Sequence, residues 1–274
     1  MKQLYNSASE PAGFHQNRGK LGLSALVIAV TLAAVSCRRA DTVAENAVAA
    51  RPAAEAIAEA DRLYDERADL VKVRQGIVAL RQAQAGDQAN YQIAWRLAKF
   101  NYFLGEHSPD TGERDKAFHD GIEAGRLAVN LQDGKPDGHF WLGANYGGKA
   151  KTSMLAGLSE FDDIKREMET VIKLDEGYQS GSAYLALGEL YLEAPGLIGG
   201  DTQKAIQNLE RGLKLGPDNG LLRATLAQAY IEAHRNEDAR KQIDAVLAMK
   251  PEAGYEAEHN EALAKVRALQ DKIK

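Results

Sequence analysis

Small and apolar residues recur at fixed spacings in the C-terminal half of the chain, in a pattern typical of paired helices. The last copy of this pattern contains Leu226, Ala227, Tyr230, Ala239, Ile243, Val246 and Pro251. The copy before it contains Leu187, Gly188, Tyr191, Ala205, Leu209, Gly212 and Pro217. The two prolines lie 34 residues apart, and each ends a second helix because proline cannot continue the hydrogen-bond ladder.

This spacing is that of the tetratricopeptide repeat, in which a small residue lets two helices approach and a tyrosine fills the gap between pairs. Weaker first helices lie upstream, at Leu142-Gly143 with Tyr146 and at Leu97-Ala98 with Asn101. We also expect an opening pair over 57–64 and 70–84 and a closing helix over 255–273. One pair cannot bury its own apolar face, so the pairs must stack. Residues 55–274 are therefore predicted to form an all-α, tetratricopeptide-like superhelix.

One insert separates the two helices of the fourth predicted pair. It covers Ala194 to Gly200, and its glycine and proline content predicts a loop.

The first 36 residues have the features of a signal peptide. The run from Leu21 to Val35 contains 15 uncharged residues, whereas a bilayer span needs about 20. Small residues then precede the single cysteine, Cys37, as in a bacterial lipoprotein cleavage box, although Ala34 replaces the commoner Leu. We expect Cys37 to carry lipid and residues 37–54 to be an alanine-rich tether.

Arg38 follows the cysteine, where an Asp would resemble an inner-membrane retention signal, so we expect a lipid anchor on the periplasmic face of the outer membrane. A secreted protein with a chance cysteine and a short uncleaved anchor remain alternatives.

The concave face of a tetratricopeptide stack carries defined positions of each first helix. The early half of this face is aromatic, and exposed rings on such a face indicate a ligand or a partner. The alternative is that inserts, the opening pair or a neighbouring subunit cover these rings as ordinary core. The candidate groove residues are Trp95, Lys99, Tyr102, Phe103, Phe140, Leu185, Glu189 and Leu192.

The sequence gives little support for nucleic-acid or nucleotide binding. The chain has 34 basic and 39 acidic residues, and this balance lacks the basic excess of a nucleic-acid binder. The run from Gly143 to Lys149 resembles a phosphate-binding loop but is followed by Ala150 instead of Ser or Thr. We therefore expect no nucleotide there, although Lys149 and Lys151 remain candidates for an anionic group.

The six histidines lack the spacing of a metal site, so we predict no metal and no cofactor. We expect the charged residues between Asp162 and Glu169, Glu167 among them, to form a solvated helix face. Nothing in the sequence indicates an active site. An enzyme with paired carboxylates remains only a residual alternative.

The stretch from Trp95 to Leu215 resembles the T-component family associated with tripartite ATP-independent periplasmic (TRAP) transporters. The resemblance is carried by AWRLA at 94–98, GHFWLGANYG at 138–147, and APGLIGGD at 194–201 leading into Lys204-Ala205. It implies a helical periplasmic lipoprotein that oligomerises around an apolar pore and associates with a periplasmic solute-binding protein.

The implied role is to pass a small hydrophobic ligand to a transport system, with the membrane reached through the lipid anchor. The rival hypothesis is a tetratricopeptide scaffold that binds protein segments during envelope assembly.

Overall fold

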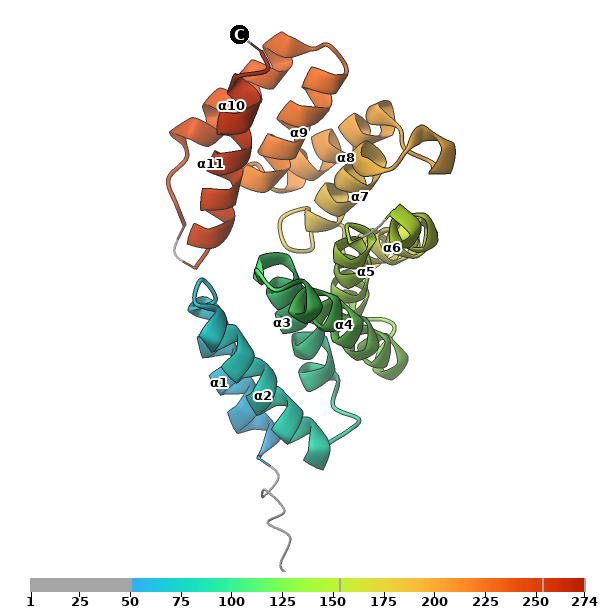
Figure 1. Ribbon diagram of the computed structural model, residues 1–274, viewed down its shortest axis with the longest axis vertical. Helices are drawn as coiled ribbons and strands as arrows, with labels where there is room; N and C mark the ends of the chain where they lie inside the picture. The colour runs from blue at the N-terminus through green and yellow to red at the C-terminus, as the bar shows by residue number, and fades with distance from the viewer. Residues whose placement is uncertain (1–50, 153, 253, 274) are drawn as a thin grey trace, which may run out of the picture. The chain divides into compact units, whose positions relative to one another are not determined.

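A computed structural model describes residues 51–152, 154–252 and 254–273, with the backbone alone for 154–158. The predicted signal peptide, Cys37 and most of the tether lie outside these residues. The described part is helical and contains no strand, which confirms the all-α fold (Figure 1). Its elements are α1 (Ala53–Asp65), α2 (Leu70–Gly86), α3 (Tyr91–His107), α4 (Thr111–Leu131), α5 (Pro136–Ala150), α6 (Met154–Leu174), α7 (Ser182–Glu193), η1 (Gly196–Ile198), α8 (Thr202–Leu215), α9 (Gly220–Glu232), α10 (Asn236–Ala248) and α11 (Glu256–Gln270).

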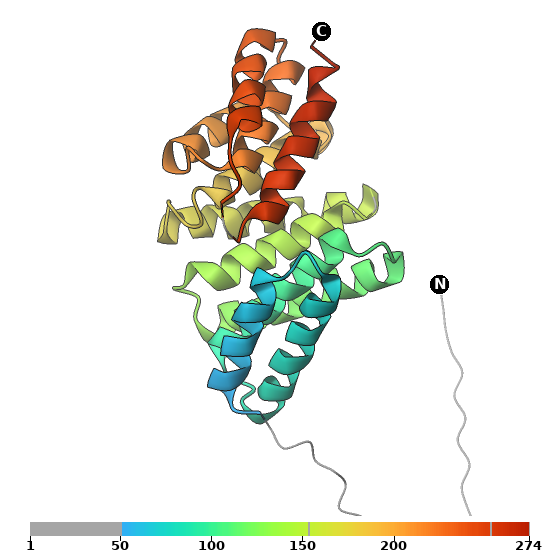
Figure 2. The ribbon, with the colours of Figure 1, turned by 90° about the vertical axis from the view of Figure 1, so that its left-hand side faces the viewer.

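Consecutive helices pack as hairpins, and each hairpin packs on the next (Figure 2). Helix α1 begins at Ala53, two residues before the predicted start of the repeat domain. The closing helix α11 packs on α9 and α10 and begins one residue after the predicted position. No helix among the described residues combines the length and the apolar character needed to cross a membrane.

Short polar residues begin five of the α-helices among the described residues. The side chains of Asp69, Asn90, Asp110, Asp201 and Asn219 each accept a hydrogen bond from a backbone N–H in the first turn of the following helix. Such caps satisfy N–H groups that have no partner inside the helix, which explains where these helices start.

Glycines set the closest contacts between helices, as the repeat pattern predicts. A Cβ added to Gly188 of α7 would lie 2.4 Å from the side chain of Leu209 in α8. A Cβ at Gly125 of α4 would lie 2.9 Å from the backbone of Leu142 in α5. A larger residue at either position would force the helices apart.

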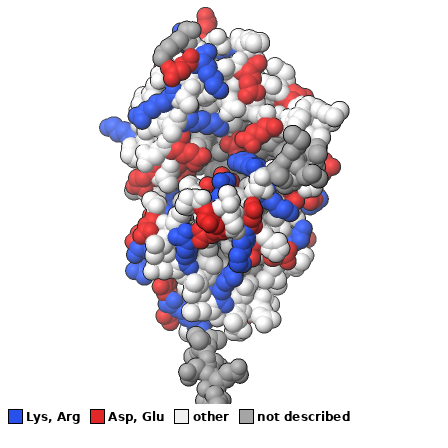
Figure 3. All heavy atoms as spheres, viewed as in Figure 1, with Lys and Arg blue, Asp and Glu red and all other residues white. Residues whose placement is uncertain are grey.

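The face seen in Figure 3 carries acidic and basic side chains interspersed with uncharged ones.

Glu167 of α6 is buried, although the sequence predicted that it lies on a solvated helix face. It is only 5% exposed, so that prediction is wrong for this residue. Its carboxylate lies 2.6 Å from Nδ1 of His139, while Nε2 of the same ring lies 2.8 Å from the backbone oxygen of Asp133. Both ring nitrogens face acceptors, so the pair favours the imidazolium, and the hydrogen bond to Glu167 raises the pKa of His139.

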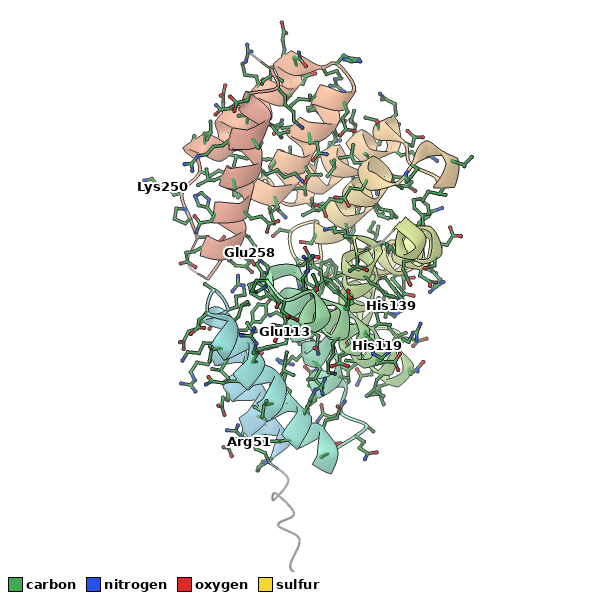
Figure 4. All side chains as sticks on the ribbon, viewed as in Figure 1. Arg51, Glu113, His119, His139, Lys250 and Glu258 are labelled. Carbon is green, nitrogen blue, oxygen red and sulfur yellow. The ribbon has the colours of Figure 1, made fainter. Side chains whose placement is uncertain are left out.

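The first hairpin and the last helix meet through one buried arginine. Arg67, in the turn between α1 and α2, donates to the backbone oxygen of Gly254 at 2.6 Å and to the carboxylate of Glu258 at 2.6 and 2.7 Å. Glu258 lies at the end of α11 nearest this turn (Figure 4). The guanidinium also lies 4.8 Å from the ring centroid of Tyr64. The concave face is therefore bounded at this point by α11.

Candidate functional site

A cavity of about 740 Å³ lies on the concave side of the stack, between α5, α6, α7 and the insert that follows α7. Its volume falls within the range of about 300–1,000 Å³ typical of small-molecule sites. Aromatic and aliphatic side chains form most of its walls. They include Tyr102 of α3, Phe140 and Trp141 of α5, Phe161 of α6, Leu185 of α7 and Ile198 of η1.

Small residues on α5 make room for the cavity. Ala144 and Gly147 both line it, and a Cβ at Gly147 would meet nothing within 4 Å. Gly143 and Gly148 line it too, but each also faces a packed side chain: a Cβ at Gly148 would lie 2.1 Å from the ring of Phe118. The glycine-rich run is thus the second half of a helix with one open face, and it does not form a loop that would cradle a phosphate.

The insert after α7 forms one wall and is built around its glycines. Gly199 has a φ of +117°, and a Cβ there would lie 2.7 Å from the ring of Phe161. A Cβ at Gly200 would lie 1.8 Å from the backbone oxygen of Ala194. These positions exclude larger residues and hold the turn so that Ile198 lines the cavity. Leu197 lies at the edge of the cavity, and its side chain is 98% exposed to solvent.

Three charged side chains line the cavity: Lys151 at the end of α5, and Glu189 and Glu193 on α7. Burial disfavours the charge of Lys151, but Glu189 and the neighbouring Glu106 outweigh it, so the pKa of Lys151 is raised. Burial raises the pKa of Glu193, and the adjacent Glu189 adds to that effect. Within the described residues, no cluster of His, Cys, Asp or Glu has the arrangement of a metal site.

The structure separates the eight predicted groove residues into two groups. Four of them line the cavity: Tyr102, Phe140, Leu185 and Glu189. Phe140 is only 8% exposed, and its ring packs on Trp141 and Tyr178, so it belongs to the core as well as to the cavity wall.

The other four lie elsewhere. The ring of Trp95 stacks with Arg96 at 4.2 Å, and Leu192 packs against the core. The ammonium group of Lys99 lies 3.5 Å from the ring centroid of Tyr64, and burial lowers the pKa of Lys99 to about 8. Phe103 is buried between helices and stacks on His107.

The repeat positions predict groove residues only on the first helix of each pair, so they missed cavity residues on other elements. Phe161 belongs to a second helix, and Ile198 and Leu197 belong to the insert. The signal for the insert was present, because a glycine- and proline-rich segment interrupts an otherwise regular repeat. Trp141 was also missed, since its position in the repeat does not point into the groove.

The fold and the site thus define a class of protein: a tetratricopeptide-like repeat protein with a largely apolar cavity. The pattern of the family described as TRAP transporter T-component matches residues 125–271, and the chain belongs to this family. The pattern described as regulator of microtubule dynamics protein 1-3 matches residues 56–193. No curated protein sequence matches the chain significantly.

One solved structure shows the same fold. The chain is similar to a thermophilic tetratricopeptide (TPR) protein of Thermus thermophilus, with 18% identity, 76% of this chain and 99% of that chain covered, and a TM-score of 0.56. A crystal structure of the MamA protein has 20% identity, covers 76% of this chain and 95% of that chain, and has a TM-score of 0.47. At 18% identity, the likeness to the Thermus thermophilus protein concerns the fold alone. Family membership indicates a role as a TRAP transporter component.

Proposed function

We propose that this protein is a non-enzymatic, membrane-tethered accessory protein that binds a small hydrophobic ligand and passes it to a solute-binding partner of a TRAP-type transport system. The observation that carries the proposal is the cavity of about 740 Å³, whose lining residues fall mostly within the matched range 125–271. Transfer of apolar ligand surface from water to such walls is favourable by about 25 cal/mol per Å².

Two sides of the cavity suit reversible binding. The packing of α5 against α6 holds the α5 wall in place, which supports a site that is formed before a ligand arrives. The opposite wall is the short insert, whose Leu197 is almost fully exposed. A pre-formed pocket avoids the entropic cost of ordering the protein on binding. We propose that the ligand enters and leaves beside the insert, where a partner protein could also reach it.

The proposal also includes the location of the protein, at a membrane surface. Lipid on Cys37 would hold the repeat domain at a membrane surface through the tether, on the periplasmic face of the outer membrane. TRAP-family membership supports association with the cell envelope. Metabolic labelling with a radioactive or alkyne-tagged fatty acid tests this part, and Cys37→Ser should abolish the label.

Fluorescence titration tests ligand binding directly. The neutral probe N-phenyl-1-naphthylamine should bind the wild-type chain, and in a Trp95→Phe variant it should quench the remaining indole, Trp141, which lines the cavity. Ala186→Phe places a ring in the cavity and should weaken binding by about tenfold or more.

The matched control is Ala58→Phe on α1, where the same ring is added at an exposed position. It should leave binding unchanged, and circular dichroism should show both variants folded. Equal binding by Ala186→Phe and Ala58→Phe, or no binding by the wild-type chain, would refute the proposed function.

A further inference from the structure

The charged side chains of the cavity are gathered in one part of its wall, whereas the uncharged polar residues Gln179 and Ser182 line it near the start of α7. Its charged groups are Lys151, which directly follows α5, and Glu189 and Glu193 in the second half of α7. The remaining walls are mainly aromatic and aliphatic. The cavity therefore has an apolar body and one charged end.

Two more carboxylates lie near that end of the cavity, one on α3 and one on α11. Glu106 of α3 lies 3.8 Å from the ammonium group of Lys151. Glu261 of α11 lies close enough for Glu189 and Glu106 to raise its pKa further, after burial itself. The closure of the stack at α11 brings these groups from distant helices into one region.

The cations in this region are fewer and already engaged. Lys151 pairs with Glu106. Lys265 of α11 donates to the hydroxyl of Thr225 at 2.8 Å and lies 3.7 Å from Glu189. Four carboxylates thus share two ammonium groups among the described residues, and His107 also lowers the pKa of Glu261.

Two further observations show that positive charge is in deficit here. Burial and a neighbouring carboxylate raise the pKa values of both Glu193 and Glu261, which means that their charged forms are poorly compensated. Independently, Oε1 of Glu106 is out of reach of solvent and accepts no hydrogen bond from any described residue. A positively charged donor beside Glu193 would improve the first of these situations, and Glu106 adds negative charge in the same region.

We propose that the ligand of this cavity is a cationic amphiphile, a small molecule whose apolar body lies against Phe140, Trp141 and Leu185 and whose amine lies between Glu189 and Glu193. This inference rests on the proposed function, since it specifies the ligand of the same cavity. An anionic amphiphile of the same size would place its charge among like charges, and a neutral one would leave the carboxylates uncompensated.

Three ligands with the same chain and different ends test the inference. Decylamine, decanoate and decanol are titrated at pH 7 against the wild-type chain loaded with N-phenyl-1-naphthylamine, and displacement of the probe reports binding. Decylamine should bind about tenfold or more tightly than either of the others. Glu193→Gln and Glu189→Gln should each remove most of this preference without weakening decanol.

Glu169→Gln is the control, because Glu169 is an exposed carboxylate on α6 that does not line the cavity. It should keep the preference for the amine. Glu189 also contacts Lys265, so Glu189→Gln could change stability as well as binding. If it lowers the melting temperature, the test depends on Glu193→Gln alone.

The outcomes separate the two proposals. Displacement of the probe by all three ligands with equal affinity, or best by decanoate, overturns the cationic ligand and leaves the hydrophobic cavity standing. The cationic ligand is also overturned if Glu193→Gln weakens all three ligands equally, because the carboxylate would then shape the cavity without selecting charge. If neither the probe nor any of the three ligands binds, both proposals fall.

Discussion

Removing Glu258 should destabilise the contact between the first hairpin and α11 more than removing its partner Arg67. The Arg67 side chain is 5% exposed, whereas that of Glu258 is 34% exposed. Glu258→Ala leaves a buried guanidinium without its carboxylate, which costs about 3 kcal/mol. Arg67→Met leaves a carboxylate that water can reach and keeps an apolar stem against Tyr64, so we expect a loss of about 1–2 kcal/mol.

The double variant gives the sharpest form of this prediction. With Arg67→Met and Glu258→Ala together, no buried charge is left unpaired. The double variant should therefore be more stable than Glu258→Ala alone, because a charge pair replaced by apolar groups often costs little.

Hydrogen exchange followed by mass spectrometry is the suitable assay, since repeat stacks open locally and a global transition can hide one contact. Protection of the amides in α11 should fall most in Glu258→Ala, least in Arg67→Met, and to an intermediate degree in the double variant. Amides of α5 and α6 serve as the internal control and should be unchanged. The reasoning is wrong if Arg67→Met loses more protection than Glu258→Ala, or if the two losses simply add.

Two further predictions concern packing and pH. Gly188→Leu should lower the free energy of unfolding in urea by about 1–3 kcal/mol or more, because a Cβ there already lies 2.4 Å from Leu209; an unchanged midpoint would show that α7 and α8 are not packed so closely. Since the pKa of His139 is raised from 6.5 by Glu167, the stabilisation from this pair should be fully present below pH 6.5 and lost as the pH rises through the folded-state pKa. Unfolding measured from pH 5 to 9 should show this slope in the wild type and a flatter curve in His139→Gln, and identical curves would contradict it.

The repeat pattern predicted the helices and their register well, because both depend on residues close in sequence. Gly188 and Tyr191 are buried on α7, as their positions in the repeat predict, and Tyr102, Leu185 and Glu189 line the cavity. These predictions need only a helical period of 3.6 residues and one small residue for each close contact.

The contacts that the sequence could not predict join residues far apart in the chain. Glu167 stands among charged neighbours, and only the packing of α5 on α6 buries it against His139. Arg67 is a charged residue in a turn, and its partner Glu258 lies 191 positions away. The net charge of the cavity end likewise depends on the curvature of the stack, which no local pattern specifies.

Native mass spectrometry of the full chain, purified from the cells that make it, tests the central claim most directly. We predict a folded protein that carries a small amphipathic molecule, with the bound fraction lost in Ala186→Phe and kept in Ala58→Phe. A folded protein with an empty cavity in every preparation, together with no affinity for the neutral probe, would contradict the account.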